Sequence, residues 1–447
     1  MIKKYYGEQT ERAIKNFAFD TYRVHKEFIE ALVQIKKAAA EANLAAGNMS
    51  HEISDAIIRA CNDVLTGKLG PEQFPLKALQ GGAGTSINMN VNEVVAHAAT
   101  KILQKRGIKI KVHSHDHANR SQSTNDVNPS AIKIASIRLT QNLQKTLRLL
   151  VRALDGKARE FRSIDKLART HLQDAVPTTL GAEFASYAAI IRWHQEKINR
   201  VVVYCQELNL GGTAIGNSVN ASPQYIAAVY KALSRNTRQN FRPASNLMSQ
   251  TSSQTDFLAM SQAVTALCVD LSKIATDFRF MASGPRGGIA EITLGELQKG
   301  SSIMPGKVNP VLPETMNQLY FLVSGNNLAI EHSAHAAQME LGVMFPLIAD
   351  RLLQSLKLTS QVTAQFTKLC VMKIKADKKR CKELLERSTA YAATLTPFLG
   401  YDAMSRSVKT AVATGKTLRE VVVGSRLMSN KEFDAAVKAI DKALKKT

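Results

Sequence analysis

The sequence predicts a mainly α-helical protein built around long helices. Ala, Leu, Gln, Lys and Arg dominate four stretches of roughly forty to fifty residues without proline, which lie between Pro129 and Pro177, Pro177 and Pro223, Pro243 and Pro285, and Pro346 and Pro397. These five residue types favour helices, whereas proline is strongly disfavoured in helix interiors. Strand-like alternation of comparable length does not occur in the sequence. The pattern therefore favours long helices over a parallel sheet with βαβ units.

The first of these stretches carries an apolar stripe. Its apolar residues recur mostly three or four positions apart, at Ile132, Leu139, Leu143, Leu147, Leu150 and Leu154. This spacing is typical of a helix packed in a bundle. Wide stripes with few aromatic residues also favour oligomers, because a bundle buries more surface by associating. Residues 108–113 are a candidate for a short strand.

Composition restricts the class of protein. The chain has 447 residues, of which 45% are hydrophobic, so it can bury a substantial core in two or three domains. Its five cysteines are odd in number and form no CxxC pair, which predicts reduced, mostly buried thiols. The basic N-terminus precedes no apolar signal region, and eighteen apolar residues never run together. We therefore expect a soluble cytoplasmic protein without membrane association.

The net charge of +22 admits two interpretations. A basic surface attracts either dianionic substrates or nucleic acid. Lys and Arg cluster in residues 101–111, 373–382 and 438–446, without the interleaved aromatics of a single-strand groove. This pattern favours solvated basic faces, and nucleic acid is not expected as a partner.

A glycine-rich turn, residues 81–90, is predicted to open a helix at Asn92. Free N–H groups at a helix start bind anions, and Thr85 and Ser86 add hydroxyl donors. A nucleotide P-loop needs a Lys after the last Gly and a preceding strand, and the sequence has neither. The turn therefore favours a carboxylate over a phosphate.

Residues 300–310 (GSSIMPGKVNP) form the most informative loop. Two adjacent hydroxyls, a Gly and Pro frame, and Lys307 with Asn309 suit a mobile lid that holds a carboxylate. For an isolated Gly-Ser-Ser, a polar surface loop would be the better interpretation.

Three further signals each have a structural alternative. Residues 123–126 have the composition of a helix N-cap. His171 alone would more often be a structural residue. His113, His115 and His117 alternate, so on a strand they would share one face and could bind a metal.

Five segments resemble, in the same order, the signatures of the aspartase/fumarase superfamily. They are residues 84–90 (GTSINMN), 121–126 (SQSTND), 169–175 (RTHLQDA), 211–216 (GGTAIG) and 300–309 (GSSIMPGKVN). The resemblance implies a lyase that eliminates a group beside a carboxylate, releases fumarate and needs no cofactor. It also implies an N-terminal domain over residues 1–122, a central bundle of long helices over 123–378 and a helical C-terminal domain over 379–447. The central domain would form the core of a homotetramer whose active sites draw residues from three subunits.

The resemblance also implies residue roles. Ser301 would be the catalytic base, and His171 would pair with Glu314. Positions matching the family's substrate-binding residues are Thr85, Ser123, Thr124, Asn125, Thr170, Gln173, Ser302, Lys307 and Asn309. Hydroxyl groups would hold the β-carboxylate, Lys307 and Asn309 with Thr170 would hold the α-carboxylate, and Asn125 with His171 would face the leaving group. The family's stretch that matches residues 113–119 supplies no metal ligand, and residues 211–216 would pack closely near the site.

The substrate prediction depends on small differences within this family. Ser123-Thr124-Asn125 resembles aspartate ammonia-lyases, as do Tyr5-Tyr6-Gly7 and residues 283–288, whereas fumarases usually carry Ser-Ser-Asn. Gly342 departs from the family's usual Asn, Phe345 from the Glu common in aspartases, and the C-terminal end is short. L-aspartate deamination to fumarate is thus the leading prediction. Fumarate hydratase activity, or a catalytically silent basic scaffold that binds RNA, remains an alternative.

Overall fold

The computed structural model describes residues 4–444, and side chains up to residue 438. The chain divides into two compact units. Unit 1 comprises residues 4–144, 195–267 and 321–360, and unit 2 comprises residues 145–194, 268–320 and 361–444. The prediction of a mainly helical fold is confirmed. The domain boundaries near residues 122 and 378 stay a prediction, although α5 begins at Thr124 and α12 at Lys378.

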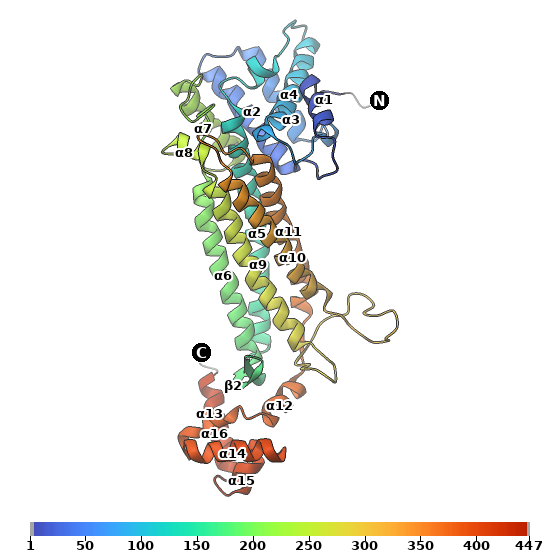
Figure 1. Cartoon of the computed structure of the whole chain (residues 1–447), viewed down its shortest axis with the longest axis vertical. Coiled ribbons are helices and arrows are strands. Elements are labelled where there is room, and N and C mark those ends of the chain that lie inside the picture. Colours follow the sequence, from blue (N-terminus) through green and yellow to red (C-terminus); the bar gives the residue numbers. More distant parts are fainter. Residues whose placement is uncertain (1–3, 445–447) are drawn as a thin grey trace. The chain divides into compact units, whose positions relative to one another are not determined.

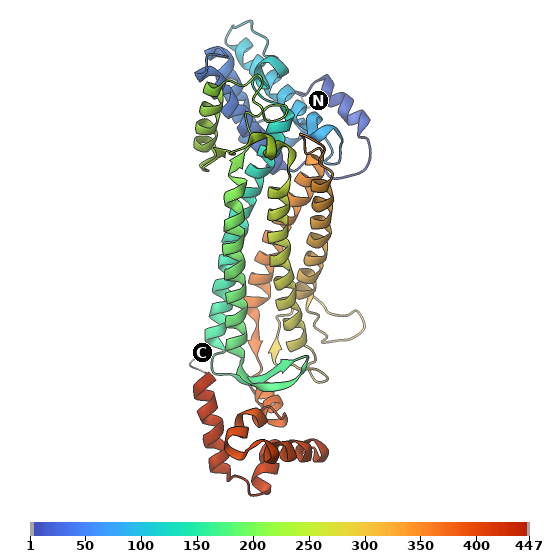
Figure 2. The ribbon, with the colours of Figure 1, turned by 60° about the vertical axis from the view of Figure 1, so that its left-hand side comes forward.

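Five long helices contribute segments to the units: α5 (Thr124–Glu160), α6 (Leu180–Cys205), α9 (Thr255–Met281), α10 (Val311–His335) and α11 (Phe345–Leu369). Within each unit these segments lie side by side (Figures 1 and 2). Four of the helices lie largely within the four proline-free stretches. Helix α10 was not among the predicted helices, because the proline-free run between Pro313 and Pro346 is shorter than the four stretches. Pro313 sits in the first turn, where a missing N–H costs no helical hydrogen bond.

Shorter helices complete unit 1. They are α1 (Glu8–Asn16), α2 (Lys26–Ala45), α3 (His51–Leu65), α4 (Thr85–Lys105), α7 (Pro223–Thr237) and α8 (Leu247–Ser252), with 3-10 turns η1 (Pro71–Gln73) and η2 (Gly82–Gly84). Local sequence explains where several begin. The Ser50 side chain caps α3 by accepting from the N–H of Ile53, and Ser222 caps α7 next to Pro223. Strands β3 (Glu207–Leu208) and β4 (Arg242–Pro243) pair in parallel.

The expected strand at residues 108–113 does not form. The segment is irregular and leads into a π-helical turn, η3 (Ser114–Ala118). The N–H of Val112 donates to the hydroxyl of Thr100 on α4 at 3.0 Å, so it is held by a side chain and not by a second strand. The longest strand pair in the described part of the chain is the antiparallel hairpin of β1 (Asp165–Thr170) and β2 (Gln173–Thr179) in unit 2 (Figure 2).

Aromatic packing fills the core of unit 2. Phe184 on α6 stacks on Phe278 of α9 with ring centroids 5.4 Å apart, and Phe278 stacks on Phe366 of α11 at 5.8 Å. Such contacts, together with buried area, dominate the energetics of a core. All five cysteines are free and buried, as expected. Helix α9 is long and apolar enough to cross a membrane by length and composition, but core helices pass the same test, and 56% of its apolar window is buried.

The C-terminal helices of unit 2 form a small cluster of their own. They are α12 (Lys378–Arg387), α13 (Tyr391–Leu399), α14 (Tyr401–Thr414), α15 (Leu418–Gly424) and α16 (Asn430–Leu444). Leu395, Met404, Val422 and Phe433 are the centre of their apolar core. The 3-10 turn η4 (Val371–Lys373) precedes β6 (Lys375–Ala376), which pairs antiparallel with β5 (Ile292–Thr293).

Candidate active site

Thr85 lies at the very start of α4, so the predicted helix begins seven residues earlier than Asn92. Ala83 and Gly84 precede it with φ of 53° and 81°, and a side chain at Gly84 would collide with the amide of Asn128. The Thr85 hydroxyl donates to the carbonyl of Gly82 at 2.8 Å. The helix start that was expected to bind an anion is therefore present, with Thr85 in its first turn.

Ser123 is the N-cap of α5, so the capping interpretation is correct for this residue. Its hydroxyl accepts from the N–H of Asn125 at 3.2 Å, and its own N–H donates to Oδ1 of Asp126 at 2.9 Å. The Thr124 hydroxyl accepts from the amide of Asn88 on α4 at 3.3 Å. Because Thr85 and Asn88 lie on one helix, this contact ties the start of α4 to residues 123–125.

A buried lysine supports the turn before α5. Lys36 on α2 is fully buried and donates to Oδ1 of Asn119 at 2.9 Å and Oε1 of Gln122 at 3.0 Å. The same Asn119 oxygen accepts from Asn88 and Asn92 at 3.1 Å each. Burial lowers the pKa of Lys36 to about 7. Lys36 was not among the residues predicted from the sequence, although it interrupts the apolar residues of α2.

Asp126 joins the turn to the glycine-rich loop at 211–216. Its Oδ2 accepts from the N–H groups of Gly211 and Thr213 at 3.0 Å each. Burial raises the pKa of Asp126 to about 7, opposed by its backbone donors. Gly216 leaves no room for a side chain, because a β-carbon there would lie 2.4 Å from the backbone of Met248. The expectation that this loop packs closely is thus confirmed.

Asn125 makes two contacts in unit 1. Its Nδ2 donates to the carbonyl of Ala214 at 2.8 Å, and its own carbonyl accepts from Nδ2 of Asn209 at 3.1 Å. That carbonyl needs an outside donor because Pro129, four residues later in α5, has no N–H. In the sequence, the proline four residues after Asn125 was the sign that the Asn125 carbonyl needs a donor from outside the helix.

Thr170 and Gln173 face each other at the end of the β1–β2 hairpin. Between them His171 and Leu172 form a two-residue turn with φ of 54° and 59°. Such turns normally use Asn or Gly, so two bulky residues here mark a strained position, of the kind that clusters at functional sites. The structure thus presents His171 at an exposed hairpin tip.

A buried ionic cluster anchors this hairpin. Lys166 on β1 contacts Glu183 of α6 at 2.7 Å and Glu291 at 3.0 Å, and Arg169 contacts Glu291 at 2.9 Å. Glu291 and Lys166 are almost completely buried. Burial raises the pKa of Glu183, with Lys166 opposing the shift. None of these residues was singled out from the sequence beyond the position of Arg169 in its motif.

The 300–310 loop is closed at its base. The amide of Asn309 donates to the carbonyl of Gly300 at 2.6 Å, and a side chain at Gly300 would collide with the carbonyl of Lys307. At the start of the loop, Oγ of Ser301 accepts from the N–H of Ile303 at 3.2 Å and of Met304 at 3.0 Å. Ser302 and Lys307 are exposed, and Ser301 is half-buried.

A pocket of about 570 Å³ opens beside the base of this loop. Lys307, Asn309 and Arg279 line it together with Ser283 and Gly284 of the 283–288 turn. Arg380 of α12 fixes that turn by donating to the carbonyls of Gly288 and Ile289 at 3.0 Å each. The pocket therefore combines two of the segments singled out from the sequence.

Known proteins resemble this chain over nearly its whole length. A lyase family model matches residues 2–325, and a fumarase C C-terminus model matches residues 392–441. An aspartate ammonia-lyase of Bacillus subtilis is 41% identical over 96% of this chain and 90% of its own length. A class II fumarate hydratase of Brucella suis is 40% identical, with 98% and 94% covered. The chain belongs to the aspartase/fumarase superfamily.

A solved structure agrees with this assignment. It is a fumarate lyase:delta crystallin from Brucella melitensis bound to cobalt, with a TM-score of 0.94, 38% identity, and coverage of 98% of this chain and 95% of that one. Relatives of both names are about equally similar, so membership of the superfamily establishes the lyase class, whose members act on small dicarboxylates, and does not decide the leaving group.

The superfamily's site residues fall into two groups in this chain. Thr85, Ser123, Thr124 and Asn125 lie in unit 1, whereas Thr170, His171, Gln173, Ser301, Ser302, Lys307, Asn309 and Glu314 lie in unit 2. In the first group, the hydrogen bond from Asn88 to Thr124 links residues 123–125 to α4, the helix that begins at Thr85. Glu314 lies in the first turn of α10, and among the described residues no hydrogen bond or ion pair joins it to His171 within one chain. Their pairing stays a prediction.

The metal alternative at His113, His115 and His117 finds no support. The π-helical turn replaces the strand that would have aligned the rings, and Nδ1 of His113 lies 3.0 Å from Asp116. Burial lowers the pKa of His117. Among the residues whose side chains are described, no group of three or more His, Cys, Asp or Glu could hold a metal ion.

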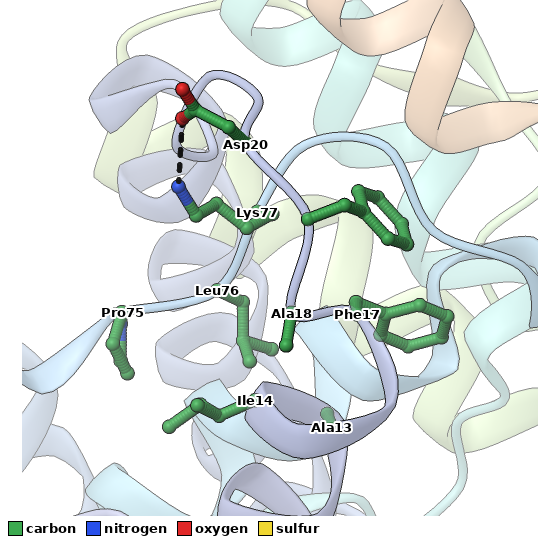
Figure 3. Close-up of a pocket in the computed structure, with 9 residues that line it drawn as sticks. Ala13, Ile14, Phe17, Ala18, Asp20, Pro75, Leu76 and Lys77 are labelled. Atoms are coloured by element: carbon green, nitrogen blue, oxygen red, sulfur yellow. Dashed lines mark ion pairs between the residues drawn. The ribbon is translucent and has the colours of Figure 1, made fainter.

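A second pocket in unit 1, of about 350 Å³, is separate from these segments (Figure 3). Its lining is mostly apolar, from Ala13, Ile14, Phe17, Ala18, Phe19, Pro75 and Leu76. Its two charged residues, Asp20 and Lys77, face each other at 3.9 Å. Because none of the superfamily's site residues lines it, we assign it no part in the reaction.

Proposed function

We propose that this chain is an aspartate ammonia-lyase, which converts L-aspartate to fumarate and ammonia by anti-elimination through an aci-carboxylate intermediate. The observation that carries this choice of substrate is the orientation of Asn125. Its amide nitrogen donates to the carbonyl of Ala214, which turns the nitrogen toward the 211–214 loop and leaves Oδ1, on the other side of the amide, as the acceptor for a ligand.

An acceptor oxygen suits an amine better than a hydroxyl as leaving group. The ammonium of aspartate carries only N–H donors, so it needs acceptors around it. A departing hydroxide instead needs a proton donor, because it must leave as water. Asn125 held in this way favours the amine, in line with the aspartase-like Ser123-Thr124-Asn125 sequence.

Ser301 is the proposed base. It would remove the proton from the carbon beside the β-carboxylate, after which the carbon–nitrogen bond breaks and ammonia leaves. A serine hydroxyl is a poor base unless its anion is stabilised. Two backbone N–H groups already point at Oγ of Ser301, and donors to the charged form favour that form. This contact supports the role taken from the family resemblance.

The intermediate carries two negative charges at the β-carboxylate end, so donors there matter most. The proposed donors are the hydroxyls of Thr85, Ser123, Thr124 and Ser302. The α-carboxylate is assigned to Lys307, Asn309 and Thr170, and the amine to Asn125 and His171, with Glu314 orienting His171 and Gln173 completing the binding site. The elimination leaves the total oxidation state unchanged, so it requires no redox cofactor.

A homotetramer with shared active sites is part of the proposal. Apolar side chains are exposed along the long helices: Val203 and Tyr204 on α6, Val269 on α9, and Leu322 and Leu328 on α10. Exposed apolar surface of this kind marks an association face. Since Ser302 and Lys307 are open to solvent in one chain, a second chain would also supply the dry environment that the dianion needs. A cytoplasmic location is proposed with it.

Ultraviolet detection of fumarate tests the proposal. The purified protein is incubated in parallel with L-aspartate and with L-malate. Fumarate from aspartate alone supports it, whereas fumarate from malate alone assigns a fumarate hydratase. No product from either would favour the silent scaffold, which a salt-sensitive gel shift with RNA would then test. Sedimentation showing an active monomer would overturn the shared site.

A further inference from the structure

We propose that Asp126 is a positioning residue that sets the orientation of Asn125, and thereby the preference for an amine leaving group. The inference rests on the proposed function. Asp126 touches no substrate in this scheme. It acts through the backbone of two segments that meet at Asn125, the turn at 123–125 and the loop at 211–214.

The carboxylate of Asp126 is shared between these segments. Oδ1 accepts from the N–H of Ser123 at 2.9 Å, and Oδ2 accepts from the N–H groups of Gly211 and Thr213 at 3.0 Å each. The side chain is completely buried, so water does not compete for these bonds. A buried carboxylate with three backbone donors fixes both segments more firmly than neutral bonds would.

The loop in turn fixes the amide of Asn125. Ala214 directly follows Thr213, whose N–H Asp126 holds, and the Ala214 carbonyl accepts from Nδ2 of Asn125 at 2.8 Å. A shift of the loop would therefore move the acceptor that determines which end of the amide faces the ligand. On the other side, Asn209 holds the carbonyl of Asn125 at 3.1 Å, so the main chain there is restrained independently.

Asp126→Asn is the informative variant because it keeps the size of the side chain. Its amide can accept through one atom only, and its NH₂ group would point at an N–H donor on at least one side. A displacement of about 1 Å at a positioning site can lower a rate about a hundredfold. We expect kcat/KM for aspartate to fall at least tenfold, with the oligomeric state unchanged.

Two readouts separate positioning from general damage. The inhibition constant of succinate, a dicarboxylate without an amine, should rise less than about threefold, because several segments hold the carboxylates. Amide hydrogen exchange in residues 211–213 should become at least tenfold faster. Asp63→Asn is the matched control, since this acid of the same unit pairs with Lys68 at 2.9 Å on the surface, and it should change none of these values.

Asp126→Glu keeps the carboxylate, so its kcat/KM should be higher than that of Asp126→Asn. If the loss in these variants came only from a poorer fit of the side chain, Asp126→Glu would be at least as impaired as Asp126→Asn. Equal losses for aspartate and succinate, or unchanged exchange at 211–213, would overturn the proposal. If the wild-type protein makes no fumarate from aspartate, the proposed function fails, while the exchange measurement still decides whether Asp126 anchors the loop.

Discussion

The side chain of Gln254 occupies the space that a side chain at Gly342 would need. Both residues bind the carbonyl of Thr251: the N–H of Gly342 donates to it at 3.0 Å, and Nε2 of Gln254 lies 3.5 Å from it. Gln254 is 2% exposed. This packing explains how the chain accommodates a glycine where its superfamily usually has Asn.

We therefore expect Gly342→Ala to destabilise the protein by about 1–3 kcal/mol, the usual cost of overpacking. Gln254→Ala should relieve much of that loss in the double variant, and denaturant unfolding of all four proteins would give the coupling energy. Gly325→Ala, on α10 with open space around it, serves as the control. Additive effects of the two substitutions would contradict the shared-space interpretation.

Ser301→Ala should reduce kcat by orders of magnitude with only a modest change in KM, because the base acts in the chemical step and contributes little to ground-state binding. Steady-state kinetics with aspartate would measure both constants. Ser302→Ala provides the comparison, since Ser302 is assigned to carboxylate binding and should affect KM as well. A larger loss of kcat in Ser302→Ala would reverse the two roles.

Glu291→Gln should cost about 3–5 kcal/mol of stability, because it leaves Lys166 as a buried charge with weaker compensation. Fumarate production should fall as well, since the cluster anchors the hairpin that carries His171. Denaturant unfolding and activity would be compared with Glu386→Gln, which alters an exposed pair with Lys382 and should leave both unchanged. Loss of stability without loss of activity would show that the cluster stabilises the fold but does not position His171.

Asp350 should make stability sensitive to acid. Burial would raise the pKa of this carboxyl, but the hydrogen bond from His25 and the charge of Arg351 outweigh it and hold the pKa below its ordinary value. A lowered folded-state pKa contributes stability above the unfolded value, and that contribution is lost as pH falls through the folded value.

Asp350→Asn should therefore lose about 1.5–3 kcal/mol of stability at pH 7, the range for hydrogen bonds to charged groups, and the difference from wild type should shrink below about pH 4. Urea unfolding at several pH values would show this. The exposed Asp20 provides a control substitution, Asp20→Asn, that should not alter the acid limb. A difference that persists at low pH would assign the loss to packing.

The helical fold followed from residues whose influence is local. Proline-free stretches predicted four of the five long helices, and the residue types at positions 123–126 predicted the N-cap at Ser123. Helix α10 was missed because its proline-free run, between Pro313 and Pro346, is shorter than the four stretches. The strand expected at residues 108–113 failed because a strand needs a partner, and there the side chain of Thr100 takes the backbone N–H instead.

The sequence by itself determined the superfamily, the candidate residues and the chemistry they favour, because the motifs are short and their side chains carry fixed functional groups. Only the tertiary structure decided which groups support these residues. Asp126 binds the backbone on both sides of Asn125, and the Lys166–Glu291 cluster anchors the hairpin that carries His171. Gln254 fills the space beside Gly342. These partners lie far apart in the chain or on other elements. Their contacts arise when folding buries charged and amide groups together, and a buried polar group must then find a partner.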